Sequence, residues 1–471
     1  MRREKRRELR WDGAPGEQAE GPIVRKGRIS MTVAASLTEA LRATVGVDHV
    51  LAGEGLTRYR LGATTPEAVV LPGDESEVSQ VLRLAWEGGW AVVPWGGGAH
   101  QCVGYRPARY DLALDVRRLG RVLEHEPADM TATAQAGIRM TDLQTQLGRG
   151  GQFLPLDAAL AGHASLGGIL ATRLTGTLRC RYGTARDLVL GVRVAHADGT
   201  ITRAGAKVVK NATGYDVTKL YLGSHGTLGI LLEATFRVYP RPAAEQAWWL
   251  RSTDLKAGQL LANRILGSSL VPNRVEFLDG SAAWACGCPE RGPSLLVSIS
   301  GIPEAIRAQA DDLARLAGEF DVTPHEIHEP GHLWAALSDF PWVTEDPERG
   351  HLRTIWRGGV LSADCARAME AIQTAIAQGG ASCIAASVAQ GALRGEVRAD
   401  TVQELARSLT SAREALAALG GYLVVLDAPE AVRRSVDVWG PPPDGVSTMR
   451  RLKAEFDPKG ILNPGRFVGG I

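Results

Sequence analysis

The feature that most constrains the fold is the clustering of glycine. The chain has 471 residues and 55 glycines. Glycine allows positive φ and lets backbone approach a ligand closely. Four glycine-rich segments each border an expected strand, which is hard to explain as four independent turns. We therefore expect the four to meet around one ligand. They are residues 94–104, residues 164–172 followed by Gly176, residues 181–187, and residues 208–220 continuing into 223–230.

The first segment, PWGGGAHQCVG, follows an expected strand at residues 91–94. Consecutive backbone N–H groups in such a loop form a nest for an anion such as a pyrophosphate. The segment has neither the Gly-Lys-Ser/Thr ending of an ATP-binding loop nor a GxGxxG motif. Taken alone it is as readily a simple turn, so its interpretation depends on the other three segments.

Composition excludes several classes of protein. Lys and Arg number 53 against 52 Asp and Glu, a net charge of +1, whereas a nucleic-acid-binding protein needs an excess of positive charge. No apolar run approaches the roughly 20 residues needed to span a bilayer. The six cysteines are irregularly spaced and predict no disulfide framework and no metal site. These features favour the cytoplasm.

The first 30 residues are polar and mixed in charge, without the apolar core of a secretory signal. We expect residues 1–37 to be a disordered or artefactual extension, with Met31 as an alternative start. Ordered structure is expected to begin near Thr38.

The hydrophobic pattern predicts an α+β protein. A first domain, residues 49–242, has expected strands at 67–71, 91–94, 111–115, 131–135, 187–197, 200–203 and 229–239, a helix capped by Asp74, and a helix at 139–147. Residues 243–440 alternate strand and helix, which predicts a covering domain with an antiparallel sheet and helices on one face. Residues 441–471 form a C-terminal segment. Trp248 and Trp249 are expected in the core of the second domain.

The four segments together resemble the FAD-binding domain of the vanillyl-alcohol oxidase and p-cresol methylhydroxylase (PCMH-type) superfamily. The resemblance covers residues 50–242 and returns in FDPKGILNPGR at 456–466. The runs PWGGG, RYGTARDLVLGVRVAHADG and KVVKNATGYDVTKL look most like FAD-binding subunits of bacterial glycolate oxidases. This resemblance implies two α+β subdomains that hold FAD noncovalently, a covering domain over the flavin, and a C-terminal segment that returns to the FAD domain.

The resemblance also implies roles for individual residues. The pyrophosphate would contact Gly96, Gly97, Gly98, Ala99, His100 and Gln101. The flavin would be lined by Ser165, Gly167, Gly168, Ala171 and Thr172, continued by Gly176, Tyr182 and Gly183, with Gly229 and Ile230 behind and Asn463 and Arg466 near the ring. Arg173 stands where relatives often carry Asn, so we leave it out of the predicted site.

The substrate site is not legible from the sequence. Relatives that oxidise 2-hydroxy acids carry a His-x-Gly-Asp-Gly-Asn motif and a Gly-Glu-His-Gly motif, and neither occurs here. His351, Arg353 and Arg357 are candidates that no spacing singles out, so the catalytic residues stay unknown. His325, His328 and His332 are expected in a polar surface loop and not at a metal, because prolines interrupt any helix there.

The resemblance implies three alternative functions. The first is a subunit that oxidises glycolate to glyoxylate and passes electrons to a second flavoprotein subunit and an iron–sulfur subunit, with any membrane association made through those partners. The others are a self-sufficient FAD-linked D-2-hydroxy-acid dehydrogenase and a non-catalytic flavin-binding relay.

Overall fold

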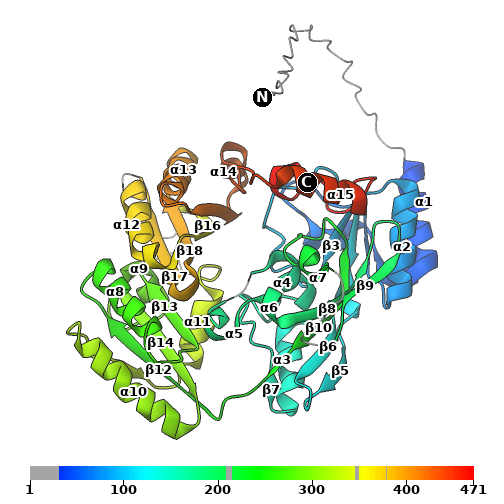
Figure 1. Cartoon of the computed structure of the whole chain (residues 1–471). Helices are drawn as coiled ribbons and strands as arrows, with labels where there is room; N and C mark the ends of the chain where they lie inside the picture. Colours follow the sequence, from blue (N-terminus) through cyan, green and yellow to red (C-terminus); the bar gives the residue numbers. More distant parts are fainter. Residues whose placement is uncertain (1–30, 175, 208–214, 345–349, 378) are drawn as a thin grey trace, which may run out of the picture.

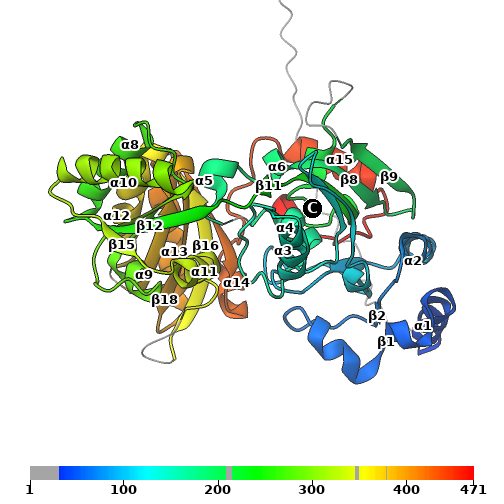
Figure 2. The ribbon, with the colours of Figure 1, turned by 90° about the horizontal axis from the view of Figure 1, so that it is seen from below.

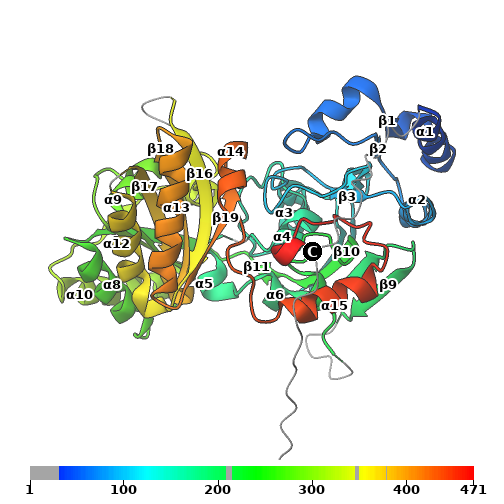
Figure 3. The same cartoon turned by 90° about the horizontal axis from the view of Figure 1, so that it is seen from above.

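The computed structural model describes residues 31–174, 176–207, 215–344, 350–377 and 379–471. The chain forms two lobes joined by the strand that leads out of β11 (Tyr239–Pro240) into β12 (Ala244–Arg251) (Figure 1). The first lobe contains β1 to β11, and the second contains β12 to β19. Residues of the C-terminus return to the first lobe, as the view from above shows (Figure 3).

A four-stranded sheet of order β1-β2-β4-β3 forms one subdomain of the first lobe. Asp74 caps α2 and accepts a hydrogen bond from the Glu77 N–H at 2.9 Å, and Gly89 ends the helix at φ 67°. This confirms the helix predicted after Asp74. The helices α1 and α2 lie together at one edge of the lobe (Figure 2). The elements are α1 (Met31–Val45), β1 (Val50–Leu51), β2 (Ala68–Val70), α2 (Glu75–Gly88), β3 (Val92–Trp95) and β4 (Leu112–Asp115).

A five-stranded antiparallel sheet of order β5-β6-β10-β8-β9 forms the other subdomain. Its apolar side chains form one core with those of α3 and α4. A short pair, β7 and β11, lies beside it. The elements are β5 (Val122–Glu126), β6 (Thr131–Gln135), α3 (Met140–Arg149), β7 (Gln152–Phe153), α4 (Leu166–Thr172), α5 (Arg179–Tyr182), α6 (Ala185–Leu188), β8 (Val189–Ala195), β9 (Ile201–Gly205), α7 (Thr218–Tyr221) and β10 (Ile230–Arg237).

The second lobe is built on an eight-stranded antiparallel sheet of order β15-β12-β14-β13-β17-β18-β16-β19. Four helices, α8, α10, α12 and α13, cover one face (Figure 3). The elements are α8 (Leu255–Leu266), β13 (Arg274–Leu278), α9 (Gly280–Ala285), β14 (Ser294–Gly301), α10 (Pro303–Gly318), β15 (His325–Ile327), α11 (Gly331–Asp339), β16 (Leu352–Gly359), α12 (Cys365–Ile376), β17 (Ala381–Ser387), β18 (Ala392–Ala399), α13 (Val402–Ala417), β19 (Tyr422–Asp427) and α14 (Glu430–Ser435).

The opposite face of this sheet is shared between α9 and α11 at one end and the first lobe at the other. Trp248 packs in the core under the four helices, and Trp249 packs with α9 and α11. Both are buried, as predicted, and they point to opposite faces because side chains alternate along a strand.

The C-terminal helix α15 (Val446–Phe456) precedes a segment that adds to the edge of the four-stranded sheet. Leu462 pairs in parallel with Val92, and the Asn463 N–H donates to the Val92 carbonyl oxygen at 2.8 Å. The last residues of the chain thereby become part of the first lobe.

Two expectations need correction and one lies outside the described residues. Helix α1 begins at Met31, so the expectation that ordered structure begins near Thr38 is wrong. His325 lies in β15, an edge strand paired with β12, and not in a loop, because its backbone extends the large sheet. The expectation of disorder for residues 1–30 concerns residues that the structure does not describe.

Candidate functional site

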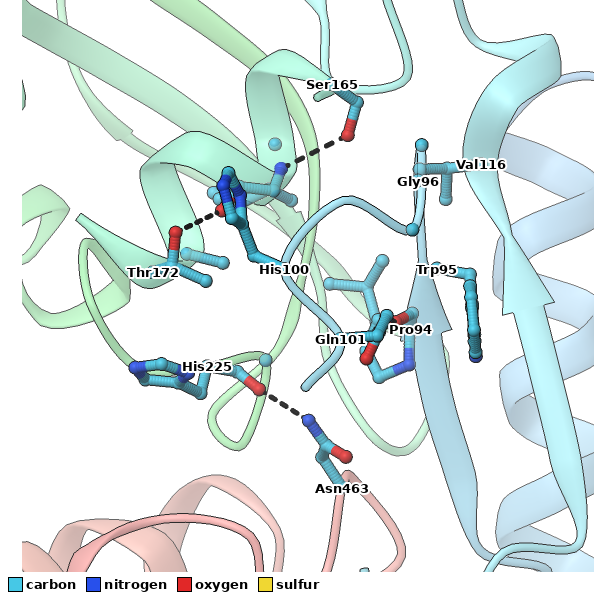
Figure 4. A pocket seen from close by; sticks show the side chains of 18 of the residues that line it. Pro94, Trp95, Gly96, His100, Gln101, Val116, Ser165, Thr172, His225 and Asn463 are labelled. Atoms are coloured by element: carbon cyan, nitrogen blue, oxygen red, sulfur yellow. Dashed lines mark hydrogen bonds between the residues drawn. The ribbon is translucent and has the colours of Figure 1, made fainter. Parts of the chain in front are cut away.

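Segments distant in the sequence enclose one cavity in the first lobe. Figure 4 shows side chains from the loop after β3, from α4, from the loop before β10 and from the C-terminal segment around it. Fifteen of the eighteen predicted cofactor residues line this cavity. They are Gly96, Gly97, Gly98, Ala99, His100, Gln101, Ser165, Gly167, Gly168, Ala171, Thr172, Gly229, Ile230, Asn463 and Arg466.

The glycine loop runs so close to the segment before α4 that side chains are excluded. A Cβ at Gly97 would lie 1.4 Å from the His163 carbonyl oxygen, and one at Gly96 would lie 2.0 Å from Ser165 Oγ. Gly98 has φ 82°. The glycines are therefore required by close backbone approach and, at Gly98, by a positive φ that other residues rarely adopt.

Helix α4 presents backbone and small side chains to the cavity. Ser165 caps the helix by accepting from the Gly168 N–H at 3.3 Å, and the Thr172 hydroxyl donates to the Gly168 carbonyl oxygen at 2.8 Å. A Cβ at Gly167 would lie 2.8 Å from Ala136 Cβ, so glycine lets the helix pack directly on the strand end.

His225 also lines the cavity, although the sequence did not single it out. Its backbone has φ 53°, a conformation that non-glycine residues rarely adopt. The Asn463 side chain donates to the His225 carbonyl oxygen at 2.6 Å, and the His225 N–H donates to the Ala171 carbonyl oxygen at 3.0 Å. Burial, together with the positive charge of Arg357 and Arg466, lowers the pKa of His225 well below 6.5, so its imidazole is neutral at pH 7.

Arg466 is a buried cation at the inner end of the cavity, with 3% of its surface exposed. It donates to the carbonyl oxygens of Gln101 and Val103. Burial lowers its pKa to about 10, so it stays charged at neutral pH. The arginine fixes the glycine loop and places a positive charge beside it.

The other residues that sequence reasoning missed come from the same segments or lie beside them. They are Pro94, Trp95, Val116, Ala164, Ser224, Gly226 and Leu231. Ser224, His225 and Gly226 belong to the GSHGTLGI run, whose glycines were the available signal.

Three predicted residues lie outside this cavity. Gly176 lines a neighbouring cavity, and a Cβ there would lie 2.1 Å from the Asp157 carbonyl oxygen. The prediction that Tyr182 and Gly183 continue the cavity wall is wrong. Tyr182 packs edgewise on the rings of Phe153 and Tyr239, and Gly183 faces Asp187.

The neighbouring cavity lies between the lobes and has a volume of about 450 Å³. It meets the first cavity, of about 100 Å³, at Thr172 and His225, which line both. Four arginines line it: Arg173, Arg179, Arg357 and Arg394. No Asp or Glu is among the described residues that line it.

Of the substrate candidates, the structure selects Arg357. Arg353 lies away from both cavities and pairs with Glu396 at 2.6 Å, and His351 pairs with Asp400 at 3.2 Å. Arg173, which we left out of the predicted site, lines the larger cavity, so that exclusion needs correction.

Within the described ranges, no cluster of His, Cys, Asp or Glu is arranged to hold a metal ion. His325, His328 and His332 form no such cluster. In the same part of the chain, no helix combines the length and apolar character required to cross a bilayer.

Two family models match the chain. The model of the FAD-binding domain matches residues 66–205, and that of the C-terminal domain of FAD-linked oxidases matches residues 441–467. Both matched ranges contribute residues to the cavity.

Characterised relatives cover most of the chain at modest identity. Glycolate oxidase subunit GlcD of Bacillus subtilis is 26% identical over 85% of this chain and 88% of its own length. Mitochondrial D-lactate dehydrogenase (cytochrome) of Arabidopsis thaliana is 25% identical over 88% and 76%. D-2-hydroxyglutarate dehydrogenase of Xanthomonas citri pv. viticola is 38% identical over 38% of each chain.

Solved structures share the fold. Alkyldihydroxyacetonephosphate synthase superposes with a TM-score of 0.72 at 20% identity, over 92% of this chain and 86% of the other. p-Cresol methylhydroxylase superposes with a TM-score of 0.72 at 15% identity, over 93% and 97%.

The residues fit FAD. Three buried polar atoms at the first cavity, His100 Nε2, Asn463 Oδ1 and Arg466 Nη1, have no hydrogen-bond partner in the described part of the chain. Such atoms are rare in proteins unless a ligand or water satisfies them. A cavity of about 100 Å³ holds only about three waters at ~30 Å³ each, so a flavin nucleotide there must extend into the larger cavity. The glycine loop, the partnerless donors and both matching family models lead to one conclusion: the chain binds FAD and belongs to the superfamily of FAD-linked oxidases.

Proposed function

We propose that the chain is an oxidoreductase that converts a 2-hydroxy acid to the 2-oxo acid. The observation that carries the proposal is the position of Arg357 where the two cavities meet. Its Nη1 donates to the Thr172 carbonyl oxygen at 3.5 Å, and Thr172 lines both cavities. A guanidinium at this point holds a carboxylate with its neighbouring carbon directed at the cofactor cavity.

The reaction removes two electrons and two protons from the substrate, as a hydride from C2 and a proton from the hydroxyl group. Bound FAD supplies the acceptor for the hydride. The proton needs a base on the protein. His225 is the imidazole that, among the described residues, lines both cavities, and it is neutral at pH 7. His225 is therefore our candidate for the proton acceptor, in a chain that lacks the histidine motifs of its catalytic relatives.

The relatives support this class of reaction. Glycolate oxidase, D-lactate dehydrogenase and D-2-hydroxyglutarate dehydrogenase all take 2-hydroxy acids as substrates by name. The likeness to a glycolate oxidase subunit supports a complex in which electrons pass to a second flavoprotein subunit and an iron–sulfur subunit. The arginine-lined cavity favours a catalytic chain over a non-catalytic relay, because a relay needs no site for a carboxylate.

Anaerobic reduction of the purified holoprotein tests the function. We expect one or more 2-hydroxy acids, from a panel that includes glycolate, D-lactate and D-malate, to bleach the flavin absorbance near 450 nm. Arg357→Gln should weaken the apparent affinity about tenfold or more, since a hydrogen bond to a charged group contributes about 1.5–3 kcal/mol. His225→Gln should lower the reduction rate with little change in affinity.

Two results would contradict the proposal. No bleaching by any acid, alone or with proteins that co-purify from the native host, would favour the relay. Bleaching only after those proteins are added would instead support the subunit over the self-sufficient dehydrogenase. A panel of substrates that reduces Arg357→Gln as readily as wild type would remove Arg357 from the site.

A further inference from the structure

We propose that the substrate carries two anionic groups joined by a short carbon chain, and that Arg173 and Arg179 bind the group remote from the reacting carbon. This inference rests on the proposed function and narrows its substrate class. Its basis is an excess of positive charge in the cavity between the lobes, at a distance from the junction where Arg357 lies.

Three of the four arginines in this cavity have no carboxylate partner. Arg394 is neutralised by Glu276, whose oxygen lies 2.9 Å from its Nη1. Arg173, Arg179 and Arg357 make no ion pair within the described residues, and Arg179 Nε is buried without any hydrogen-bond partner. Partnerless buried donors are costly, so this arrangement indicates that a ligand supplies the missing acceptors.

The three side chains come from separate elements. Arg357 lies on β16 directly opposite Arg394 on β18, on the sheet face that is turned to the first lobe. Arg173 ends α4 with φ 54°, and its side-chain stem packs on Gly223. Arg179 begins α5. Strained backbone at a non-glycine residue is typical of functional sites, and here it directs a cation into the cavity.

One monocarboxylate does not satisfy this site. A carboxylate engages one guanidinium in a bidentate pair, which would leave two further cations unpaired. The three guanidinium groups already destabilise one another: the pKa of each is lowered, first by burial, and Arg173 and Arg179 lower that of Arg357. A second anionic group between Arg173 and Arg179 relieves this repulsion.

The remaining walls suit a carbon chain. Phe340, Trp342, Leu393, Tyr422, Val424 and Trp439 line the same cavity. Its volume of about 450 Å³ lies within the range of ordinary small-molecule sites and exceeds what a two-carbon hydroxy acid fills. A four- or five-carbon dianion spans the space between Arg357 and the other two arginines.

Equilibrium binding of non-oxidisable acids tests the inference without turnover. The holoprotein is titrated by calorimetry with succinate and butyrate, with glutarate and pentanoate, and with phosphonoacetate, in which a phosphonate replaces one carboxylate. Each dicarboxylate is expected to bind about tenfold or more tightly than the monoacid of equal length, from the ~1.5–3 kcal/mol of an additional charged hydrogen bond. Tight binding of phosphonoacetate and weak binding of both dicarboxylates would assign the second group to phosphate.

Variants locate the second group. Arg173→Gln and Arg179→Gln should each remove most of the preference for dicarboxylate and leave monoacid binding within about twofold. Arg173→Lys should retain part of it, because the charge remains. Arg203 is exposed on β9, away from the cavity, and Arg203→Gln should bind as wild type does.

The inference and the proposed function fail separately. Equal affinities for glutarate and pentanoate, or a dicarboxylate preference that survives in both glutamine variants, would overturn the dianionic substrate. Flavin bleaching by glycolate would leave the oxidoreductase intact in that case. Selective dicarboxylate binding without bleaching by any 2-hydroxy acid would support the anion site and contradict the proposed reaction.

Discussion

Gly97 is the residue at which the cofactor cavity tolerates the least change. Its α-carbon faces the His163 carbonyl oxygen so closely that an added Cβ would lie 1.4 Å from that oxygen. Backbone cannot rotate away as a side chain can. Gly97→Ala should therefore displace the glycine loop, lower stability by about 1–3 kcal/mol or more, and release FAD. The FAD-to-protein absorbance ratio after gel filtration and the thermal unfolding midpoint measure the two effects.

Gly162 supplies a matched control in the adjoining segment. It is exposed, and an added Cβ would meet nothing within 4 Å. Gly162→Ala should retain the wild-type FAD content and melting temperature. A fully loaded Gly97→Ala protein of unchanged stability would show that the loop does not press on residue 163 in solution.

At the scale of elements, the turn after α15 determines whether the C-terminal segment reaches the cavity. Asp457, 2% exposed, accepts hydrogen bonds from the N–H groups of Ile461 at 3.0 Å and Leu462 at 2.7 Å. It also pairs with Lys453 at 2.6 Å, and Lys453 donates to the carbonyl oxygens of Thr227 and Leu462 at 2.8 Å each. One carboxylate thus fixes the helix, the returning segment and the loop that contains His225.

Asp457→Asn should weaken this network, because the amide removes the negative charge that compensates buried Lys453. Breaking a buried ion pair costs about 3–5 kcal/mol, and the loss should appear as a lower unfolding midpoint in denaturant. FAD affinity should fall as well, since Asn463 and Arg466 belong to the returning segment. Asp444→Asn changes an exposed carboxylate before the same helix and should alter neither. Unchanged FAD affinity in Asp457→Asn would separate the turn from the cofactor site.

The sequence predicts those elements whose signals are local. The helix after Asp74 combines a cap, an apolar period and a terminal Gly89, and the cofactor cavity is anticipated where glycines cluster. The arginine cavity was missed because Arg173, Arg179 and Arg357 lie on separate elements and meet only when the lobes pack together. His225 was missed for a related reason: its positive φ is imposed by Ala171 and Asn463, which are remote in sequence.

At the scale of the whole molecule, two buried histidines join the lobes. The His100 ring packs against Trp342 with centroids 5.1 Å apart, and the His225 ring packs against Trp439 at 5.1 Å and Phe467 at 5.4 Å. Burial lowers the pKa of His100 to about 4 and that of His225 well below 6.5. Both rings are neutral in the folded protein under conditions in which they would take up a proton in the unfolded chain.

This difference predicts acid-sensitive stability. Between pH 6.5 and about 4 the unfolded state binds more protons than the folded state, so the stabilisation is complete above pH 6.5 and decreases as the pH falls toward 4. For His100 the loss at pH 5 is about 2 kcal/mol, from an unfolded pKa of about 6.5.

Urea unfolding of the FAD-free protein at pH 7.5 and pH 5 measures the loss, since FAD would add its own charges beside both rings. His100→Gln and His225→Gln should each unfold with a smaller difference between the two pH values than wild type, whatever their absolute stability. His163→Gln, which changes an exposed histidine beside the same cavity, should retain the wild-type difference. An unchanged difference in both buried-site variants would show that these rings are protonated in the folded protein, which would in turn remove His225 as a neutral proton acceptor at the junction of the two cavities.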